Sequence, residues 1–465
     1  MKRLLTVFLT ICLCMTVFTS CKTKFEPQSA KELWDKINKT MDSLDAYETD
    51  GTGKVSLTVS GVQFTMDITA KNIVSDINGK DYYYYSYSEI SIKQVANSSL
   101  TNSSQEIMHE KSMEAFHDGK MFISSESDER TQKLYSALTK EKFLAYLENK
   151  GTDIDDIDLN SCTNASFAQN EDGTWSLQYS GYTKKAIDQM VKAFGMDNAG
   201  FDFDVQDMEI SILADEKFRA KEMNVKFIFD EDNANSSFEI FSKYSNYNAV
   251  TRITDVLNPE EYTEIEDCTL IYEIEDMLEA LEEKTDGSFT LNMTQKVSIP
   301  TLNQSHLYSE QDTVTYGKKN GAYFYNATAT AGSENFEISY ANGKQTILVS
   351  GQEQTVSQTE DEAKAYISGL INTAKYSADY VSTLTKKSDG VYEIQCHQPE
   401  SSAYDAIFEA YSGKTKSIVQ TITVTVENGS IVKIENHTLA KGTASTGYQQ
   451  IAMEIELTST NVFTN

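Results

Sequence analysis

Hydrophobic and polar residues alternate along much of this chain. Residues 55–59 interleave Val, Leu and Val with Ser and Thr, and the pattern returns at residues 64–69 and 289–293. Because successive side chains of a β-strand point to opposite faces, a period of two predicts strands with one apolar and one polar face. We therefore expect antiparallel sheets that bury one face.

A different period predicts two amphipathic helices. Within residues 31–47 and 274–281, apolar residues recur at steps of three and four, which is the spacing of one helix face. A Thr-Asp-Gly sequence follows each segment, at residues 49–51 and 285–287. The apolar residues of the two segments are Leu33, Trp34, Ile37, Met41 and Leu44, then Ile274, Met277, Leu278 and Leu281.

Further motifs recur in the same order, which indicates two tandem copies. A Thr-capped helix is expected at Thr139–Leu147 and again at Thr359–Ile367. A turn that leads into an alternating strand is expected at residues 171–177 and again at residues 388–394. The spacing between the copies stays nearly constant, as it does in internal repeats.

The boundary between the copies is expected near Pro259. Pro27 and Pro259 lie upstream of the two opening helices, where proline favours an extended break. Residues 260–267 read EEYTEIED, which is typical of a solvated connector. The predicted organisation is a first domain at residues 30–257, an acidic linker at residues 258–270 and a second domain at residues 271–465.

The repeated unit resembles a known lipoprotein fold. Its turns at Asp118–Lys120 and Asn342–Lys344 precede further strands, and turn-strand-helix blocks follow at Asp172–Phe194 and Asp389–Tyr411. A helix-first unit of this kind resembles the LolA/LppX-like lipoprotein family. The resemblance implies a curved antiparallel sheet, or half-barrel, with helices packed on its concave face over an apolar cavity for acyl chains. The expected fold class is α+β, with two such sheets in tandem.

The apolar residues of the opening helices are candidates for lining these cavities. Packing in an ordinary core is the alternative for most of them. The candidates for contact with a ligand are Trp34, Ile37, Met41, Leu44, Ile274, Met277 and Leu281.

A tyrosine-rich strand is a candidate recognition surface. Residues 81–92 read DYYYYSYSEISI, which places Tyr83, Tyr85 and Tyr87 on one face. Tyrosine offers rigid contact area with a polar tip, so this face could recognise a partner. The alternative is a sheet face that an amphipathic helix covers.

The first residues predict export and lipidation. A basic start at residues 1–3 precedes an apolar run at residues 4–18, which is too short to span a bilayer and is typical of a signal peptide. Phe18-Thr19-Ser20-Cys21 resembles a bacterial lipobox, whose cysteine receives a diacylglyceryl group. We predict a signal peptide at residues 1–20, lipidation of Cys21 and a tether at residues 21–29. Two acyl chains suffice for stable anchoring, so the expected location is the extracytoplasmic face of a cell membrane.

Charge and cysteine content narrow the picture further. The 465 residues include 70 acidic and 40 basic ones, for a net charge of −30, which excludes a nucleic-acid partner and flat docking on anionic lipid. Beyond the signal and the lipidation site, the cysteines are Cys162, Cys268 and Cys396. The sequence is compatible both with a Cys162–Cys268 disulfide and with small buried thiols.

The sequence offers no catalytic motif. None of its five histidines has the spacing of a zinc site, and no serine-hydrolase, P-loop or dinucleotide motif is present. The acidic run at residues 153–158 lacks the Gly and Glu of a calcium loop. We expect no enzyme, metal or cofactor, and instead a membrane-anchored binding protein for a hydrophobic or lipid-like ligand. The alternative is a structural lipoprotein that displays an acidic, Tyr-rich surface to an envelope partner.

Overall fold

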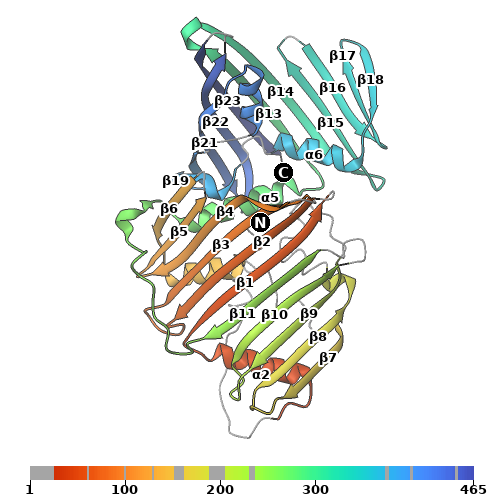
Figure 1. The fold of residues 1–465 in the computed structure, drawn as a ribbon. Coiled ribbons are helices and arrows are strands. Elements are labelled where there is room, and N and C mark those ends of the chain that lie inside the picture. The colour runs from red at the N-terminus through yellow and green to blue at the C-terminus, as the bar shows by residue number, and fades with distance from the viewer. Residues whose placement is uncertain are drawn as a thin grey trace. The chain divides into compact units, whose positions relative to one another are not determined.

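The computed structural model describes residues 26–464 except 60–61, 99–100, 128–129, 151–161, 188–204, 230–235, 333, 372–375, 398–401 and 446–448. The predicted signal peptide, Cys21 and the acidic run at residues 153–158 lie outside the described residues. The chain divides into two compact units, Met1–Tyr262 and Thr263–Asn465. Each unit builds one large sheet (Figure 1).

The sheet of the first unit is antiparallel and has its strands in the order β6-β5-β4-β3-β2-β1-β11-β10-β9-β8-β7. Two meanders meet where β1 pairs with β11, with Val55 opposite Phe238. The strands are β1 (Ala46–Val59), β2 (Val62–Ser75), β3 (Tyr83–Ser98), β4 (Thr101–His117), β5 (Lys120–Ser127), β6 (Arg130–Ala137), β7 (Cys162–Gln169), β8 (Trp175–Tyr182), β9 (Val205–Ala214), β10 (Ala220–Phe229) and β11 (Ser237–Ser245).

Helices pack on this sheet. Helix α2 (Ala30–Asp42) begins at Ser29, whose side chain accepts a hydrogen bond from the Glu32 N–H, and it lies against β7 and β8. Helix α3 (Lys140–Lys150) buries Phe143, whose ring stacks on Phe116 of β4 with centroids 4.7 Å apart. The helices bury apolar surface that the sheet alone would leave in water.

The opening helix is shorter than predicted. It ends at Asp42 rather than near Tyr47, and β1 begins at Ala46. Leu44 lies beyond the helix but is still buried. The apolar spacing therefore continued past the end of the helix, which made the predicted segment too long.

The second unit repeats this plan with the strand order β18-β17-β16-β15-β14-β13-β23-β22-β21-β20-β19. Its first long strand, β13, pairs with its last, β23, as β1 pairs with β11. The strands are β13 (Gly287–Ile299), β14 (Gln304–Lys319), β15 (Ala322–Ala331), β16 (Glu334–Ala341), β17 (Lys344–Val349), β18 (Gln352–Ser357), β19 (Val381–Ser388), β20 (Val391–His397), β21 (Thr415–Glu427), β22 (Ser430–Ser445) and β23 (Gln450–Thr464).

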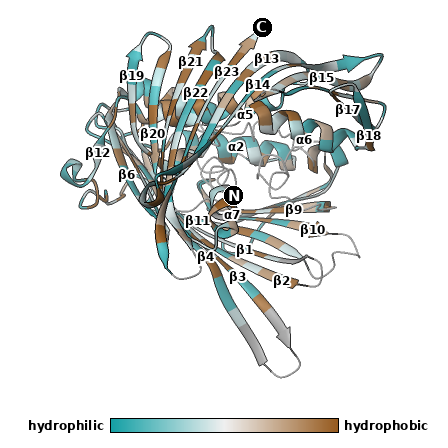
Figure 2. Ribbon diagram, turned by 90° about the horizontal axis from the view of Figure 1, so that it is seen from above, coloured by the Kyte–Doolittle hydropathy of each residue, from teal (hydrophilic) through white to brown (hydrophobic). Residues whose placement is uncertain are grey.

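Helices lie on the concave side of this second sheet. Figure 2 shows α5 (Cys268–Glu282) and α6 (Glu360–Ile371) inside its curve, and α7 (Ser402–Ala410) packs on β21 and β22. Asn461 of β23 donates hydrogen bonds from Nδ2 to the carbonyls of Leu370 and Ile371, at 2.8 and 3.0 Å. These bonds satisfy two carbonyls at the end of α6 that have no partner within the helix.

These observations confirm the predicted fold class. The protein is α+β, and both sheets are curved, antiparallel and open, with β18 and β19 at the two edges of the second. The predicted second domain begins too late, because α5 starts at Cys268 and its capping residue is Asp267. Tyr262, which we placed in the linker, packs against the core of the first unit.

Candidate functional site

The face of the second sheet that points away from its helices carries polar side chains. On β13, Phe289 and Leu291 are buried, whereas Asn292 and Thr294 are exposed. Residues that pair directly across neighbouring strands point to the same face of a sheet. The pairings therefore show which side chains share the outer face with Asn292 and Thr294.

Two rows of residues cross this outer face, the first over four strands and the second over three strands and the glycine that follows β15. The first, the Asn292 row, joins Asn292 to Gln311 and Thr330 on one side and to Thr460 on the other. The second, the Thr294 row, consists of Thr294, Ser309, Gly332 and Thr458.

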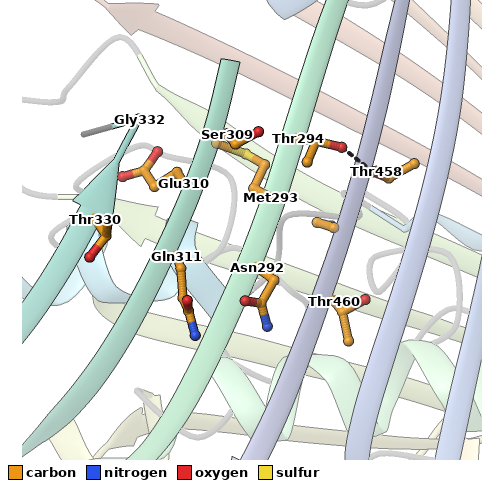
Figure 3. Close-up of a pocket in the computed structure, with 11 residues that line it drawn as sticks. Asn292, Met293, Thr294, Ser309, Glu310, Gln311, Thr330, Gly332, Thr458 and Thr460 are labelled. Atoms are coloured by element: carbon orange, nitrogen blue, oxygen red, sulfur yellow. Dashed lines mark hydrogen bonds between the residues drawn. The ribbon is translucent and has the colours of Figure 1, made fainter. Parts of the chain in front are cut away.

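A groove lies between the two rows. It has a volume of about 400 Å³ and is lined by both rows together with Met293, Glu310 and Ser459 (Figure 3). These three residues pair with one another between the rows, so their backbone forms the floor and their side chains point to the opposite face. We call this feature the polar groove.

The walls of the polar groove are uncharged and hydrogen-bonding. The hydroxyls of Thr294 and Thr458 lie 2.5 Å apart, and the Thr330 hydroxyl donates to Asn335 Oδ1 of β16 at 3.0 Å. Hydroxyl and amide groups can both donate and accept hydrogen bonds. The groove therefore suits a ligand with neutral groups that do the same.

Charged residues beyond β23 are paired with one another. Thr460 lies opposite Glu435 of β22, which forms a 2.8 Å ion pair with Lys433. Thr458 lies opposite His437, whose Nε2 is 3.1 Å from Glu456. The charges at this margin are thus held by local partners.

The opposite face of the same strands buries a carboxyl group. Asp312 of β14 is 3% exposed, and its Oδ1 has no hydrogen-bond partner among the described residues. Burial raises the pKa of Asp312 to about 6, with a further contribution from Glu310. Glu310 itself accepts a 2.9 Å hydrogen bond from the Tyr308 hydroxyl.

Six of the seven residues predicted to line apolar cavities lie on α2 or α5, and Leu44 follows the end of α2. Trp34 and Met277 are half-buried, and none of the seven candidates lines the polar groove. The buried ones are Ile37, Met41, Leu44, Ile274 and Leu281.

The predicted tyrosine surface is wrong for two of its three residues. Tyr83 and Tyr85 are buried in a cluster with Phe122 and Leu257. The Tyr83 hydroxyl donates to the Ile253 carbonyl at 2.7 Å and accepts from the Ile253 N–H at 2.9 Å. An irregular segment from the end of the first unit, rather than a helix, covers this face.

Tyr87 stays partly accessible. Its hydroxyl donates to Glu89 at 3.0 Å. Burial, together with this carboxylate, raises the pKa of Tyr87 to about 12. The position is therefore a neutral hydrogen-bonding group at any physiological pH.

Cysteine and histidine residues assemble no reactive centre within the described part of the chain. Cys162 and Cys268 form no disulfide, and Cys268 and Cys396 are buried. Burial raises the pKa of the Cys396 thiol to about 12. Among the described residues no group of His, Cys, Asp or Glu could hold a metal ion, and no helix is long and apolar enough to cross a bilayer.

The polar residues of β13 and β23 are a sequence signal for the polar groove, and the apolar spacing alone does not reveal it. Thr290, Asn292 and Thr294 alternate with the apolar residues of β13, whereas Thr458 and Thr460 of β23 are interleaved with the polar Ser459 and Asn461. Such alternation marks the outer face of a strand as uniformly hydroxyl- or amide-bearing. It cannot show that the two strands are neighbours.

Comparison with known proteins gives only distant likenesses. No protein-family model and no curated protein matches the chain. It is similar to a solved domain from Vibrio parahaemolyticus assigned to outer membrane lipoprotein sorting, at 8% identity and a TM-score of 0.18, covering 43% of this chain and 92% of that one. A protein from Nitrosomonas europaea assigned as AttH is 8% identical with a TM-score of 0.13, covering 90% of this chain and 93% of that one.

Proposed function

We propose that this chain is a lipid-anchored protein on the extracytoplasmic face of a membrane, and that it binds an envelope molecule in the polar groove without transforming it. The observation that carries the proposal is the groove itself. It joins seven hydroxyl- or amide-bearing side chains from four neighbouring strands around a volume of about 400 Å³. Strands hold such side chains in fixed register, which lowers the cost of ordering them on binding.

The side chains of the two rows favour binding over catalysis. General acid–base and nucleophilic catalysis need a carboxylate, imidazole, thiol or activated hydroxyl next to its base. The rows contain Asn, Gln, Ser, Thr and Gly only. The Glu310 carboxylate is on the other face, where it accepts from Tyr308.

The proposed anchor rests on the N-terminal sequence. A basic start, an apolar run at residues 4–18 and small residues before Cys21 together support cleavage and diacylation there. The groove would then face the extracytoplasmic side, where envelope polymers and lipids are the abundant ligands.

A hydrophobic ligand held under the helices is the second candidate. Apolar concave faces beneath α2 and α5 support it, although most candidate lining residues are buried in the core. Native mass spectrometry of gently extracted protein tests this candidate. A bound lipid, in stoichiometric amount, would favour it over the groove.

The proposed function is tested with lipid-free mature chain, residues 22–465, and its Asn292→Ala/Gln311→Ala variant. Each is mixed with envelope material stripped of lipid and protein, and the sedimenting fraction is measured over a concentration series. We expect saturable binding that weakens at least about tenfold in the variant, since it loses two amide groups. Absence of saturable binding, or equal binding by both proteins, would contradict the proposal.

A further inference from the structure

We infer that the ligand of the polar groove is an uncharged glycan chain that lies across the strands, along the Asn292 and Thr294 rows. The inference rests on the proposed function and names its ligand class. The chemistry of the rows, their charge, their direction and the open end at β15 support it.

The chemistry of the rows matches that of sugar hydroxyls. A sugar hydroxyl donates one hydrogen bond and accepts others, so it needs partners of both kinds. Asn292 and Gln311 each offer a donating and an accepting atom side by side, and Thr294, Thr458, Thr460 and Ser309 offer hydroxyls. A lipid chain would offer no hydrogen-bond partner to the Asn292 and Gln311 amides or to the Thr460 and Ser309 hydroxyls, which opposes its binding.

The charge of the groove selects against ionic polymers. The chain as a whole carries a net charge of −30, which repels polyanions. A polycation would need carboxylates in the groove, but no side chain of either row is charged. Lys433 and Glu435 at the margin neutralise one another. A neutral polymer is not repelled by the net charge and needs no carboxylate in the groove.

The direction of the groove fits an extended chain. Neighbouring strands lie about 4.8 Å apart, so the three intervals from β23 to β15 give a length of roughly 14 Å. The two rows are separated by two residues along each strand, which is about 7 Å. These dimensions suit a narrow linear molecule rather than a compact one.

The end of the groove at β15 is open. Gly332 ends the Thr294 row there with φ +63°, and a Cβ at this position would meet nothing within 4 Å. Thr330, which ends the Asn292 row, hydrogen-bonds to Asn335 of β16. A longer chain can therefore continue past the groove, so the interior of a polymer fits as well as its end.

The position of the groove excludes a peptide strand as occupant. A peptide that extends a sheet needs an edge with unpaired backbone groups. The floor of the groove is formed by β23, β13 and β14, which are all paired on both sides. Recognition must therefore come from the side chains of the two rows.

The test uses lipid-free mature chain and an array of oligosaccharides. The array carries neutral polymers of glucose, mannose, xylose and N-acetylglucosamine, with carboxymethylated, sulfated and deacetylated forms of the same backbones. The groove variant is Thr294→Val/Thr458→Val, which keeps side-chain shape and removes one cross-strand hydroxyl pair. Its matched control is Thr346→Val/Thr355→Val, since these hydroxyls form a 3.3 Å cross-strand pair on β17 and β18 of the same sheet.

We expect at least one neutral glycan to bind, its ionic derivatives to bind at least about tenfold more weakly, and the affinity to fall at least about tenfold in the groove variant alone. Tighter binding of an ionic form, or an equal loss of affinity in the groove variant and its matched control, would overturn the inference. If no glycan binds while groove-dependent binding to envelope material persists, the glycan class is wrong and the proposed function stands. If both fail, both proposals are wrong.

Discussion

At the scale of single residues, Asp312 is a buried carboxyl group whose surroundings oppose its charge. Its folded-state pKa of about 6 lies above 3.8, the ordinary pKa of an aspartate side chain. Both folded and unfolded chains hold the proton at pH 3, whereas above pH 6 the folded chain must bury the charge. The ionised group therefore destabilises the fold increasingly as pH rises from about 4 to 6.

Replacing Asp312 by Asn should raise the free energy of unfolding at pH 8 by up to about 3 kcal/mol, because the substitution removes the buried charge and keeps the shape. The gain should shrink as pH falls through 6 and vanish near pH 4. Urea unfolding at several pH values measures it, with Asp286→Asn as an exposed control in the same unit. A pH-independent effect would show that charge burial is not the cause.

The predicted membrane location depends on lipidation of Cys21. Cys21→Ser removes the thiol that receives the diacylglyceryl group, so the protein should move from the membrane to the soluble fraction. Fractionation with radiolabelled palmitate checks both the location and the modification. A variant that remains in the membrane and is still labelled would refute the anchor.

The sequence did not predict the surroundings of Tyr83. Alternation placed Tyr83, Tyr85 and Tyr87 on one face correctly. Yet Ile253 and Leu257, distant in sequence, cover two of them. Local periodicity gives the face on which a side chain lies, and it carries no information about which distant segment packs there.

At the scale of elements, α2 tests whether the candidate lining residues form a core or a ligand site. Ile37 is fully buried on the face of α2 that also buries Leu33 and Met41. Ile37→Ala should lower the free energy of unfolding by about 3 kcal/mol through lost burial and a cavity. Lys31→Ala, which breaks an exposed pair with Asp35, should cost under about 0.5 kcal/mol.

Thermal or urea unfolding of both variants checks this prediction. A small decrease in the free energy of unfolding of Ile37→Ala, together with loss of a bound lipid, would indicate that α2 lines a ligand cavity instead.

Elements were predictable where one local period decided them. Residues 289–293 alternate as expected, with Phe289 and Leu291 buried. The end of α2 was not predictable in this way, because Leu44 continues the apolar spacing after the helix has ended. The polar groove needs β13 and β23 side by side, and their separation in sequence hides that pairing.

At the scale of the whole molecule, each of the two compact units contains one of the large sheets. The second unit contains every strand and helix that forms the polar groove. Residues 263–465 made alone should therefore fold cooperatively and keep the binding of the full chain. Circular dichroism and a binding series check both, and a folded fragment without binding would place the site elsewhere.

Binding in the polar groove is tested by measuring the equilibrium binding of three forms of the mature chain to delipidated envelope material: unaltered, Thr294→Val/Thr458→Val and Thr346→Val/Thr355→Val. Circular dichroism first confirms that all three are folded. We expect the groove variant alone to bind at least about tenfold more weakly. Equal affinities in the three proteins would contradict this expectation.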